Sequence, residues 1–564
     1  MSYKNQKNKK EISILIFLFI LVFILILIFP FRLDLSSDKR YTISPVSKKL
    51  MQQLDAPLKV TLYLEGDLNP GFLRMKKSTI QMLEELSAYS KKGIEIKTIN
   101  PSLAKSSTER EKNYLKLSSH GLTPTAVYER DKEGKAIQKI IFPWLEIEYK
   151  GNKTLVNLLK NLPGNSGEQN INISIENLEF EITDAIRRLT STQVNKIAFL
   201  EGHGELSEAE TYDISKALSR YFQIDRGIIG TDASILDDYK VLIVAKPMFP
   251  FSEKDKFIID QYIMKGGRIL WLIDGVQLSK ENLSTVGFSP AWALDINLND
   301  QLFRYGVRIN PVLLQDVQCV LVPVNVAPQN QSPHFEPMPW YFAPLLLTSY
   351  QHPITRNIAE VKTDFCSSID AVGNNPHIKS TVLLATSNNT HIIPTPATID
   401  LRVLPKANDK EYFNLGYVPV AILVEGSFES VFKNRMLPAG LININKVQYQ
   451  SKPTRQIFVA DGDIIRNETS GLATDSTTLS LGFDRYMNQQ FGNKDFIQNA
   501  VLYLTDDEGW MQLRTKTFKL RLLNKNAVND KKNICQVINI SVPIILLALF
   551  GIIYQWIRKR KYSK

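Results

Sequence analysis

The chain has 564 residues, too many for one hydrophobic core, and its 44% hydrophobic and 22% charged content is that of a globular protein. Of its net charge of +11, the first eleven residues carry +3 and the last seven carry +5. This distribution argues against nucleic-acid binding and indicates a membrane topology. Three cysteines without a C-x-x-C spacing exclude a disulfide framework and a zinc site of that type; Cys319 and Cys366 either pair or remain separate buried thiols.

An uncharged apolar run extends from Ile12 to Phe29, directly after the Lys-rich start of the chain. As a helix it would be about 27 Å long, close to the hydrocarbon thickness of a bilayer. A cleaved signal peptide is the alternative, but Phe29-Pro30-Phe31 lacks the small residues of a cleavage site. The sequence therefore predicts a cytoplasmic tail over 1–11 and an uncleaved transmembrane helix over 12–31.

Residues 40–160 have the pattern of a small α/β module. Apolar residues alternate in the strands and recur every three or four positions in the helix. The expected elements are a strand over 58–64, a helix over 72–89, and strands over 94–99, 125–128 and 137–149. This order is typical of a thioredoxin-like module, although the redox cysteines of such modules are absent here.

Residues 174–530 alternate between short apolar strands and amphipathic helices. The expected elements are helices over 174–189, 208–221 and 253–264, and strands over 197–200, 241–245 and 268–273. Such a pattern favours a parallel sheet with helices on both faces, and hence an α/β domain outside the membrane. Later strands, over 381–386, 418–425 and 456–460, either complete the same sheet or form a second lobe.

A second apolar run, over 535–557, is followed at once by a basic tail over 558–564. Tyr554 and Trp556 stand where a transmembrane helix carries its aromatic belt. A buried core helix is the alternative, but it does not account for the basic end. Because both ends are basic, both termini are expected in the cytoplasm and the middle on the outer side. The predicted tails are too short for an ATPase, so ATP-driven work is expected from partners.

The segment from Glu201 to Glu205, with His203 at its centre, follows the strand that ends at Leu200. Ligands bind at such carboxyl ends in α/β folds, and a histidine between carboxylates suits a base or a ligand contact. We therefore consider Glu201, His203 and Glu205 as candidate ligand-binding residues. The alternative is a strand-to-helix turn whose polar groups cap the next helix.

Asp461 and Asp463 surround a glycine after another strand, and two such carboxylates suit a divalent cation. An Asx-type turn is the alternative. Arg304 and Arg308, close to two aromatic residues, suit an interface or an anionic ligand, or else a salt-bridged surface. The chain contains neither G-x-x-x-x-G-K-[ST] nor G-x-S-x-G, so it carries neither a P-loop nor that nucleophile elbow.

Several stretches together are distinctive. They are VTLYLEGD from Val60, FLEGHGEL from Phe199, DKFIIDQ from Asp255, LFRYGVRIN from Leu302, FKNR from Phe432 and DGDIIRN from Asp461. With the two terminal anchors, they resemble the GldG family, the auxiliary membrane subunits of the gliding-motility ABC transporter of Bacteroidetes. The resemblance covers the chain from about residue 40 onward. It implies an amidotransferase-like (flavodoxin-like) α/β domain, partnership with the ATPase GldA and the permease GldF, and a link to gliding or type IX secretion.

The sequence thus predicts a non-enzymatic auxiliary subunit of an ABC transporter, located in the inner membrane with its main domain in the periplasm. Expected partners are the ATPase, the permease, the lipid bilayer and envelope motility or secretion proteins; no cofactor is indicated. Two alternatives remain at this stage. One is a periplasmic hydrolase that acts on envelope glycan or peptide, and the other is a purely structural envelope subunit.

Overall fold

In the computed structural model, the described residues are 17, 42–516 and 531–562, apart from gaps at 105, 131–134, 192–193, 329–330, 374, 402, 404, 406–408, 445 and 471–476. Residues 42–516 belong to one compact unit and residues 531–562 to another, and each is described by itself. The transmembrane helix predicted over 12–31 lies outside the described residues, apart from Phe17.

The amino-terminal part of the first unit is built on a four-stranded sheet in the order β2-β1-β5-β6. β1 pairs in parallel with β2 and antiparallel with β5, which pairs antiparallel with β6. The strands are β1 (Leu58–Leu62), β2 (Ile94–Thr98), β5 (Trp144–Tyr149) and β6 (Asn152–Asn157). The helices that share its apolar core are α2 (Pro45–Gln52), α3 (Pro70–Ser87), α5 (Gly167–Glu176) and α6 (Leu178–Thr190).

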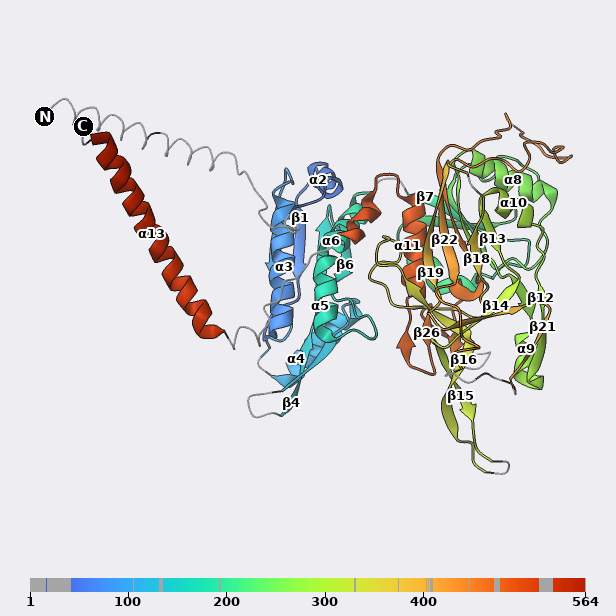
Figure 1. The fold of residues 1–564 in the computed structure, drawn as a ribbon, viewed down its shortest axis with the longest axis horizontal. Coiled ribbons are helices and arrows are strands. Elements are labelled where there is room, and N and C mark those ends of the chain that lie inside the picture. The colour runs from blue at the N-terminus through green and yellow to red at the C-terminus, as the bar shows by residue number, and fades with distance from the viewer. Residues whose placement is uncertain are drawn as a thin grey trace. The chain divides into compact units, whose positions relative to one another are not determined.

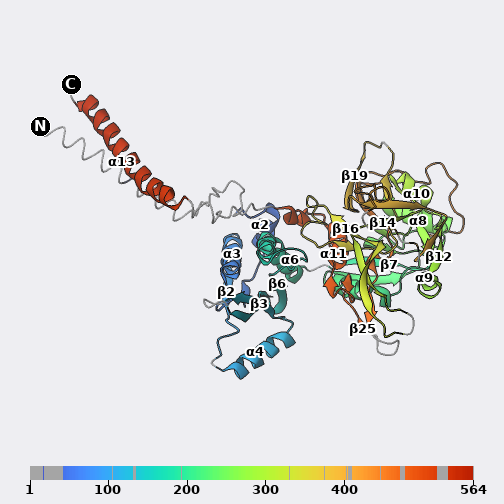
Figure 2. The ribbon, with the colours of Figure 1, turned by 60° about the horizontal axis from the view of Figure 1, so that its bottom comes forward.

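Three elements of this part differ from the sequence prediction. The strand expected over 137–149 is interrupted at Pro143, which has no amide proton for a ladder, and the earlier half joins a separate hairpin of β3 (Thr125–Arg130) and β4 (Ala136–Ile141). The helix expected over 174–189 is divided at Asn177, where α5 ends and α6 begins. Helix α4 (Ser107–Ser119) was not predicted because it buries no residue, and Figure 2 shows it standing apart.

The rest of the first unit is organised around a ten-stranded mixed sheet in the order β15-β16-β19-β22-β23-β10-β9-β7-β8, with β17 paired to β16. The strands from β23 to β8 are parallel, whereas those from β15 to β23 are antiparallel. The parallel strands are β7 (Asn195–Leu200), β8 (Phe222–Gly227), β9 (Tyr239–Ala245), β10 (Arg268–Leu272) and β23 (Thr454–Val459). The others are β15 (Cys319–Asn325), β16 (Phe335–Thr348), β17 (Val361–Lys362), β19 (Ile378–Ala385) and β22 (Pro419–Gly426).

The late strands β19, β22 and β23 therefore complete the same sheet, which decides between the two arrangements that the sequence left open. Counted in chain order, the parallel strands follow the order 2-1-3-4-5. Helix α11 (Asn493–Thr505) contacts β9, β10 and β23, and α8 (Glu253–Met264) contacts β10. Figure 1 shows these two helices on opposite sides of the sheet, as expected for strands that are apolar on both faces.

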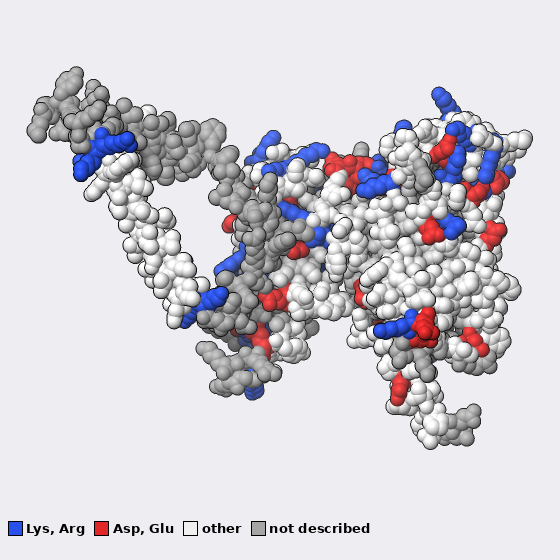
Figure 3. Space-filling model, in the orientation of Figure 1, with Lys and Arg blue, Asp and Glu red and all other residues white. Residues whose placement is uncertain are grey.

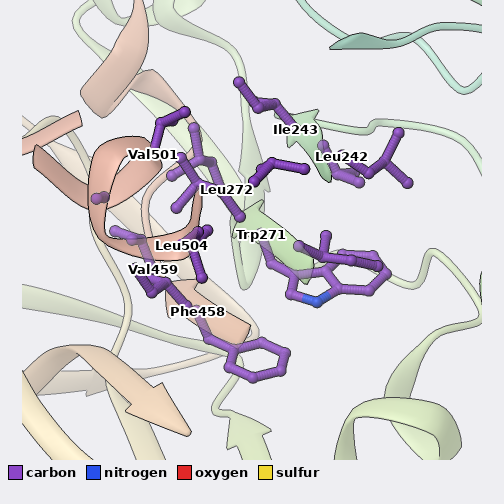
Figure 4. Close-up of a cluster of buried hydrophobic side chains, with 14 of the residues drawn as sticks. Leu242, Ile243, Trp271, Leu272, Phe458, Val459, Val501 and Leu504 are labelled. Carbon is purple, nitrogen blue, oxygen red and sulfur yellow. The ribbon is translucent and has the colours of Figure 1, made fainter. Parts of the chain in front are cut away.

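The core divides at the sheet because successive side chains of a strand point to opposite faces. Leu272 and Val459 are opposite each other in adjacent strands, and Figure 4 shows them beside Val501 and Leu504 of α11. The preceding pair, Trp271 and Phe458, points to the other side, with stacked rings 6.2 Å apart. The Trp271 indole N–H donates to the side-chain oxygen of Gln456 at 3.0 Å, so this buried donor has a hydrogen-bond partner.

Smaller elements surround this sheet. The helices are α7 (Tyr212–Leu218), α9 (Lys280–Val286) and α10 (Asn299–Arg304). Three small sheets are formed by β11 (Val276–Leu278), β12 (Phe288–Ala293) and β21 (Ala397–Asp400), by β13 (Val307–Ile309) and β18 (Ile369–Ala371), and by β14 (Val312–Asp316) and β20 (Thr390–Pro394).

The second unit contains the helix α13 (Lys532–Tyr562). Within the described part of the chain, the segment Lys532–Arg560 is the one helix long and apolar enough to cross a membrane, with a mean hydropathy of 2.4 and no buried residues. Figure 3 shows its middle without charged side chains and Lys or Arg at both of its ends. Length and composition thus agree with the predicted carboxyl-terminal span.

Candidate functional site

Charged residues follow three adjacent parallel strands at the same edge of the sheet. Lys246 comes directly after β9, Asp274 two residues after β10, and Asp461 two residues after β23. Because β9, β10 and β23 are neighbours and run in the same direction, their carboxyl ends meet. This is the edge at which open α/β sheets bind ligands.

Six side chains form what we call the aspartate–lysine network: Lys246, Asp274, Lys280, Asp364, Asp461 and Asp463. The ammonium group of Lys246 lies 2.6 Å from Asp463 and 3.2 Å from Asp274. That of Lys280 lies 2.7 Å from Asp463 and 2.5 Å from Asp364. Asp463 is therefore shared by both lysines, and each lysine bridges it to a second carboxylate.

Backbone amides fix the turn that carries the two aspartates. The fully buried Asp461 carboxylate accepts the amides of Asp463 at 2.8 Å and Asp364 at 3.1 Å. Asp274 accepts the amide of Gly462 at 2.5 Å. A Cβ at Gly462 would lie 2.6 Å from Cγ of Lys246, so this position admits no side chain without displacement. Lys246 itself has a φ of 59°, an uncommon value for a residue with a side chain.

The two neighbouring aspartates have opposite electrostatic environments. Burial raises the pKa of Asp461 well above its usual value, and the charges of Asp274 and Asp463 act in the same direction. Burial also opposes ionisation of Asp463, but Lys280 and Lys246 outweigh it and lower its pKa. The arrangement favours a protonated Asp461 and an ionised Asp463. Lysine ammonium groups thus neutralise Asp463, whereas Asp461, the other carboxylate that the sequence suggested as a cation ligand, is bonded to backbone amides.

Within the described ranges, no group of three or more His, Cys, Asp or Glu side chains is arranged to hold a metal ion. The sequence had singled out Asp461 and Asp463 but not their partners. Lys246 and Asp274 were recognisable in principle, since each follows a strand that ends in a run of apolar residues. Lys280 and Asp364 lie in distant segments and gave no local signal.

His203 is buried, and both of its ring nitrogens and its ring face contact other side chains. Its Nδ1 lies 3.2 Å from Glu205 and its Nε2 lies 3.3 Å from Asp255, while its ring stacks on Phe251 at 3.8 Å. Burial disfavours the charged ring, but Asp255 and Glu205 outweigh this and raise the pKa of His203 to about 9. At neutral pH the ring is therefore an imidazolium, which has no free lone pair to act as a base.

The other residues of this turn are also engaged. Glu201 forms an ion pair with Arg226 at 2.7 Å. The carbonyl oxygen of His203 accepts the amides of Met248 and Phe249, which follow β9. The turn thus brings Glu205 and His203 together and ties the end of β7 to the end of β9.

The two arginines pair with different carboxylates. Arg304 contacts Glu429, whereas Arg308 lies 3.0 Å from Asp370. The structure therefore does not join them in one anion site. Cys319 and Cys366 are both buried and free. Burial raises the pKa of Cys319 to about 12 and that of Cys366 well above its usual value, so neither thiol is activated.

Comparison with known families gives two matches. A family described as ABC-type uncharacterized transport system (ABC_transp_aux) matches residues 195–500, and one described as a domain of unknown function (DUF7088) matches residues 37–148. The first match covers more than half of the chain and includes all five parallel strands and the aspartate–lysine network.

A relative and a solved structure are also similar. A protein of Borreliella burgdorferi that bears the name "Uncharacterized protein" is 22% identical over 546 residues, which cover 94% of each chain. The solved "mmIFT52 N-terminal domain" is 13% identical, with a TM-score of 0.30, and the match covers 55% of this chain and 98% of that one.

Proposed function

Since the chain belongs to the ABC-type uncharacterized transport system family, whose members are auxiliary to transport, we propose that it is a non-enzymatic subunit of an ABC transporter complex. An ATPase and a permease are its proposed partners, and its large domain contacts substrate or partner proteins. The family match over the sheet domain is the observation that carries this proposal.

The geometry of the strand ends supports a binding or structural role over catalysis. Base catalysis by His203 would need a neutral ring, but two carboxylates favour its charged form. Asp463 is engaged by two lysines, and Asp461 by two backbone amides. These contacts tie strand ends together, which suits a rigid domain that presents a surface to other proteins.

We further propose that the chain crosses the inner membrane twice, with both termini in the cytoplasm and the main domain in the periplasm. The apolar helix Lys532–Arg560 supports the second crossing, and the basic residues beyond it support a cytoplasmic carboxyl terminus. The first crossing rests on the apolar run over 12–29.

The strand orders support finer fold assignments. In the amino-terminal sheet, a parallel β1–β2 pair flanked by the antiparallel β5–β6 hairpin suits a thioredoxin-like module. The order 2-1-3-4-5 of the parallel strands is that of flavodoxin-like folds and suits an amidotransferase-like domain. We propose both assignments, together with a specific kinship to GldG and a role in gliding or type IX secretion.

Purification of the tagged, full-length chain from its native membranes in a mild detergent tests the proposed function. We expect an ABC ATPase and a permease to be enriched, by mass spectrometry, over a control purification of an unrelated two-pass membrane protein with the same tag. Recovery of the chain without either partner, from cells that express both, would contradict the proposal.

A further inference from the structure

A cavity of about 660 Å³ lies away from the aspartate–lysine network, at the end of α10 and beside the start of β19. Its walls come from separate segments of the chain: Phe303 and Arg304 at the end of α10, the loop around Asn375 before β19, and the segments around Glu429 and Tyr449. This volume is within the range of sites that enclose small molecules.

A buried residue of α8 fixes two of these walls. Asp260 is fully buried and accepts hydrogen bonds from Tyr305 Oη at 2.8 Å, Ser430 Oγ at 2.7 Å and the Val431 amide at 3.1 Å. Tyr305 is adjacent to Arg304, and Ser430 is adjacent to Glu429. The Asp260 carboxylate thus fixes the segments that carry Arg304 and Glu429, two of the charged residues that line the cavity.

The wall around Tyr449 is held by Gln261, the next residue of α8. The side chain of Gln261 donates to the carbonyl oxygen of Gln448 at 3.0 Å and accepts the Gln448 amide at 2.9 Å. The Ser430 amide donates to the carbonyl oxygen of Tyr449 at 2.9 Å, which joins this wall to the second one. The cavity is therefore preorganised by buried polar contacts and needs no ligand to form.

The charges in the cavity leave one cation in excess. Arg304 and Lys433 both pair with the single carboxylate of Glu429. His377, which also lines the cavity and can carry a positive charge, is exposed. Arg304 and Lys433 retain about 40% and 50% exposure of their side chains, so their remaining donors face solvent. An anion in the cavity would pair with the positive charge that Glu429 alone does not neutralise.

The remaining lining is aromatic and hydrogen-bonding. Phe303 is 56% exposed and Tyr449 44% exposed, so both offer ring surface to a ligand. Hydroxyl and amide groups come from Asn375, Ser380, Ser427 and Gln450. Aromatic surfaces pack against the C–H faces of sugar rings, amides and hydroxyls pair with sugar hydroxyls, and the excess cation pairs with an acidic group.

We infer that this cavity binds an acidic carbohydrate, through a carboxylate held by Arg304 and Lys433 and a sugar ring packed on Phe303 or Tyr449. The inference goes beyond the proposed function, because such binding requires no transporter partner and can be measured on the isolated protein. The two proposals can therefore fail separately.

The test uses the full-length chain in nanodiscs of phosphatidylcholine, because glycoside detergents would compete for the site. Ligand-observed NMR titrations with D-glucuronate, D-glucose and acetate separate the contributions of ring and charge. We expect D-glucuronate to bind more tightly than either of the other two. We expect Arg304→Gln and Lys433→Gln each to weaken D-glucuronate binding by about tenfold, as for the loss of one charge-assisted contact.

Two further variants distinguish a direct effect on ligand binding from a loss of binding caused by misfolding. Glu429→Gln removes the internal competitor for both cations, so we expect D-glucuronate to bind more tightly, a gain that damage to the fold would not produce. Arg308→Gln breaks a comparable exposed pair outside the cavity lining and should leave binding unchanged. Equal binding of acetate or D-glucose, or unchanged binding in Arg304→Gln and Lys433→Gln, would overturn the inference.

Discussion

The amide of Asp463 donates a 2.8 Å hydrogen bond to the carboxylate of Asp461, yet the pKa values of these two aspartates shift in opposite directions. Asp461 is enclosed by apolar surroundings and by other carboxylates, whereas Asp463 lies between two ammonium groups. The surroundings thus favour the neutral form of Asp461 and the charged form of Asp463 within one turn. This turn joins the ends of three parallel strands, so its stability affects the whole sheet domain.

Asp463→Asn is expected to destabilise the protein more than Asp461→Asn. The first change leaves Lys246 and Lys280 without their shared anion and should cost about 3 kcal/mol, as for a broken buried ion pair. The second replaces a group whose surroundings favour its neutral form, but it leaves one of two backbone amides without an acceptor and should cost about 1–2 kcal/mol. Denaturant unfolding followed by tryptophan fluorescence measures both, and the reverse ranking would contradict the assigned charges.

Gly462→Ala is expected to destabilise the sheet domain by about 1–3 kcal/mol, because its methyl group would overlap the side chain of Lys246. Gly227→Ala is the matched control, since a Cβ there meets nothing within 4 Å. Thermal unfolding of the two variants compares them directly. Equal melting temperatures would show that the turn tolerates a side chain and that the close packing is not required.

His203 is expected to make stability depend on pH on the alkaline side. Its folded pKa of about 9 exceeds the ordinary value of 6.5. The stabilisation is therefore complete below pH 6.5 and disappears as the pH rises through 9. His203→Gln removes the titrating group, so the difference in melting temperature between wild type and variant should shrink from pH 6 to pH 10. A constant difference over this range would contradict the proposed imidazolium.

Glu179 is expected to stabilise the contact between the amino-terminal part and residue 516. It is buried, and it accepts hydrogen bonds from the Ser44 amide at 2.8 Å, Ser47 Oγ at 2.8 Å and Lys516 Nζ at 2.7 Å. Glu179→Ala should cost about 3 kcal/mol and accelerate trypsin cleavage near residue 516. Lys49→Gln breaks an exposed pair with Glu508 and should change stability by less than about 0.5 kcal/mol. Similar effects of both changes would contradict a buried clamp at Glu179.

The sequence-based predictions of secondary structure were most accurate where a single physical signal determined the element. The strands predicted over 241–245 and 268–273 became β9 and β10, because apart from Arg268 their residues are all apolar, as burial on both faces requires. The polar residues after β7 and β23 were recognised at the correct edge of the sheet. Their contacts were not, since these involve residues such as Lys280 and Asp364 that only the fold brings near.

Elsewhere, local signals were weak or conflicting. The strand prediction over 137–149 ignored Pro143, whose missing amide ended the ladder. Helix α4 buries no side chain, so it produced no apolar period to detect. The cavity beside α10 was not predicted as a whole, because its walls come from separate segments of the chain, around residues 304, 375, 429 and 449. Arg304 was singled out, but Lys433 and Glu429 carried no comparable signal.

The most direct test of the transporter assignment is purification through a tag on the ABC ATPase that the first purification identifies. Quantitative mass spectrometry then measures how much of this chain accompanies the ATPase from native membranes. The assignment predicts recovery in a fixed ratio to the ATPase and the permease, retained through size-exclusion chromatography. Recovery no greater than that of an unrelated inner-membrane protein would contradict it.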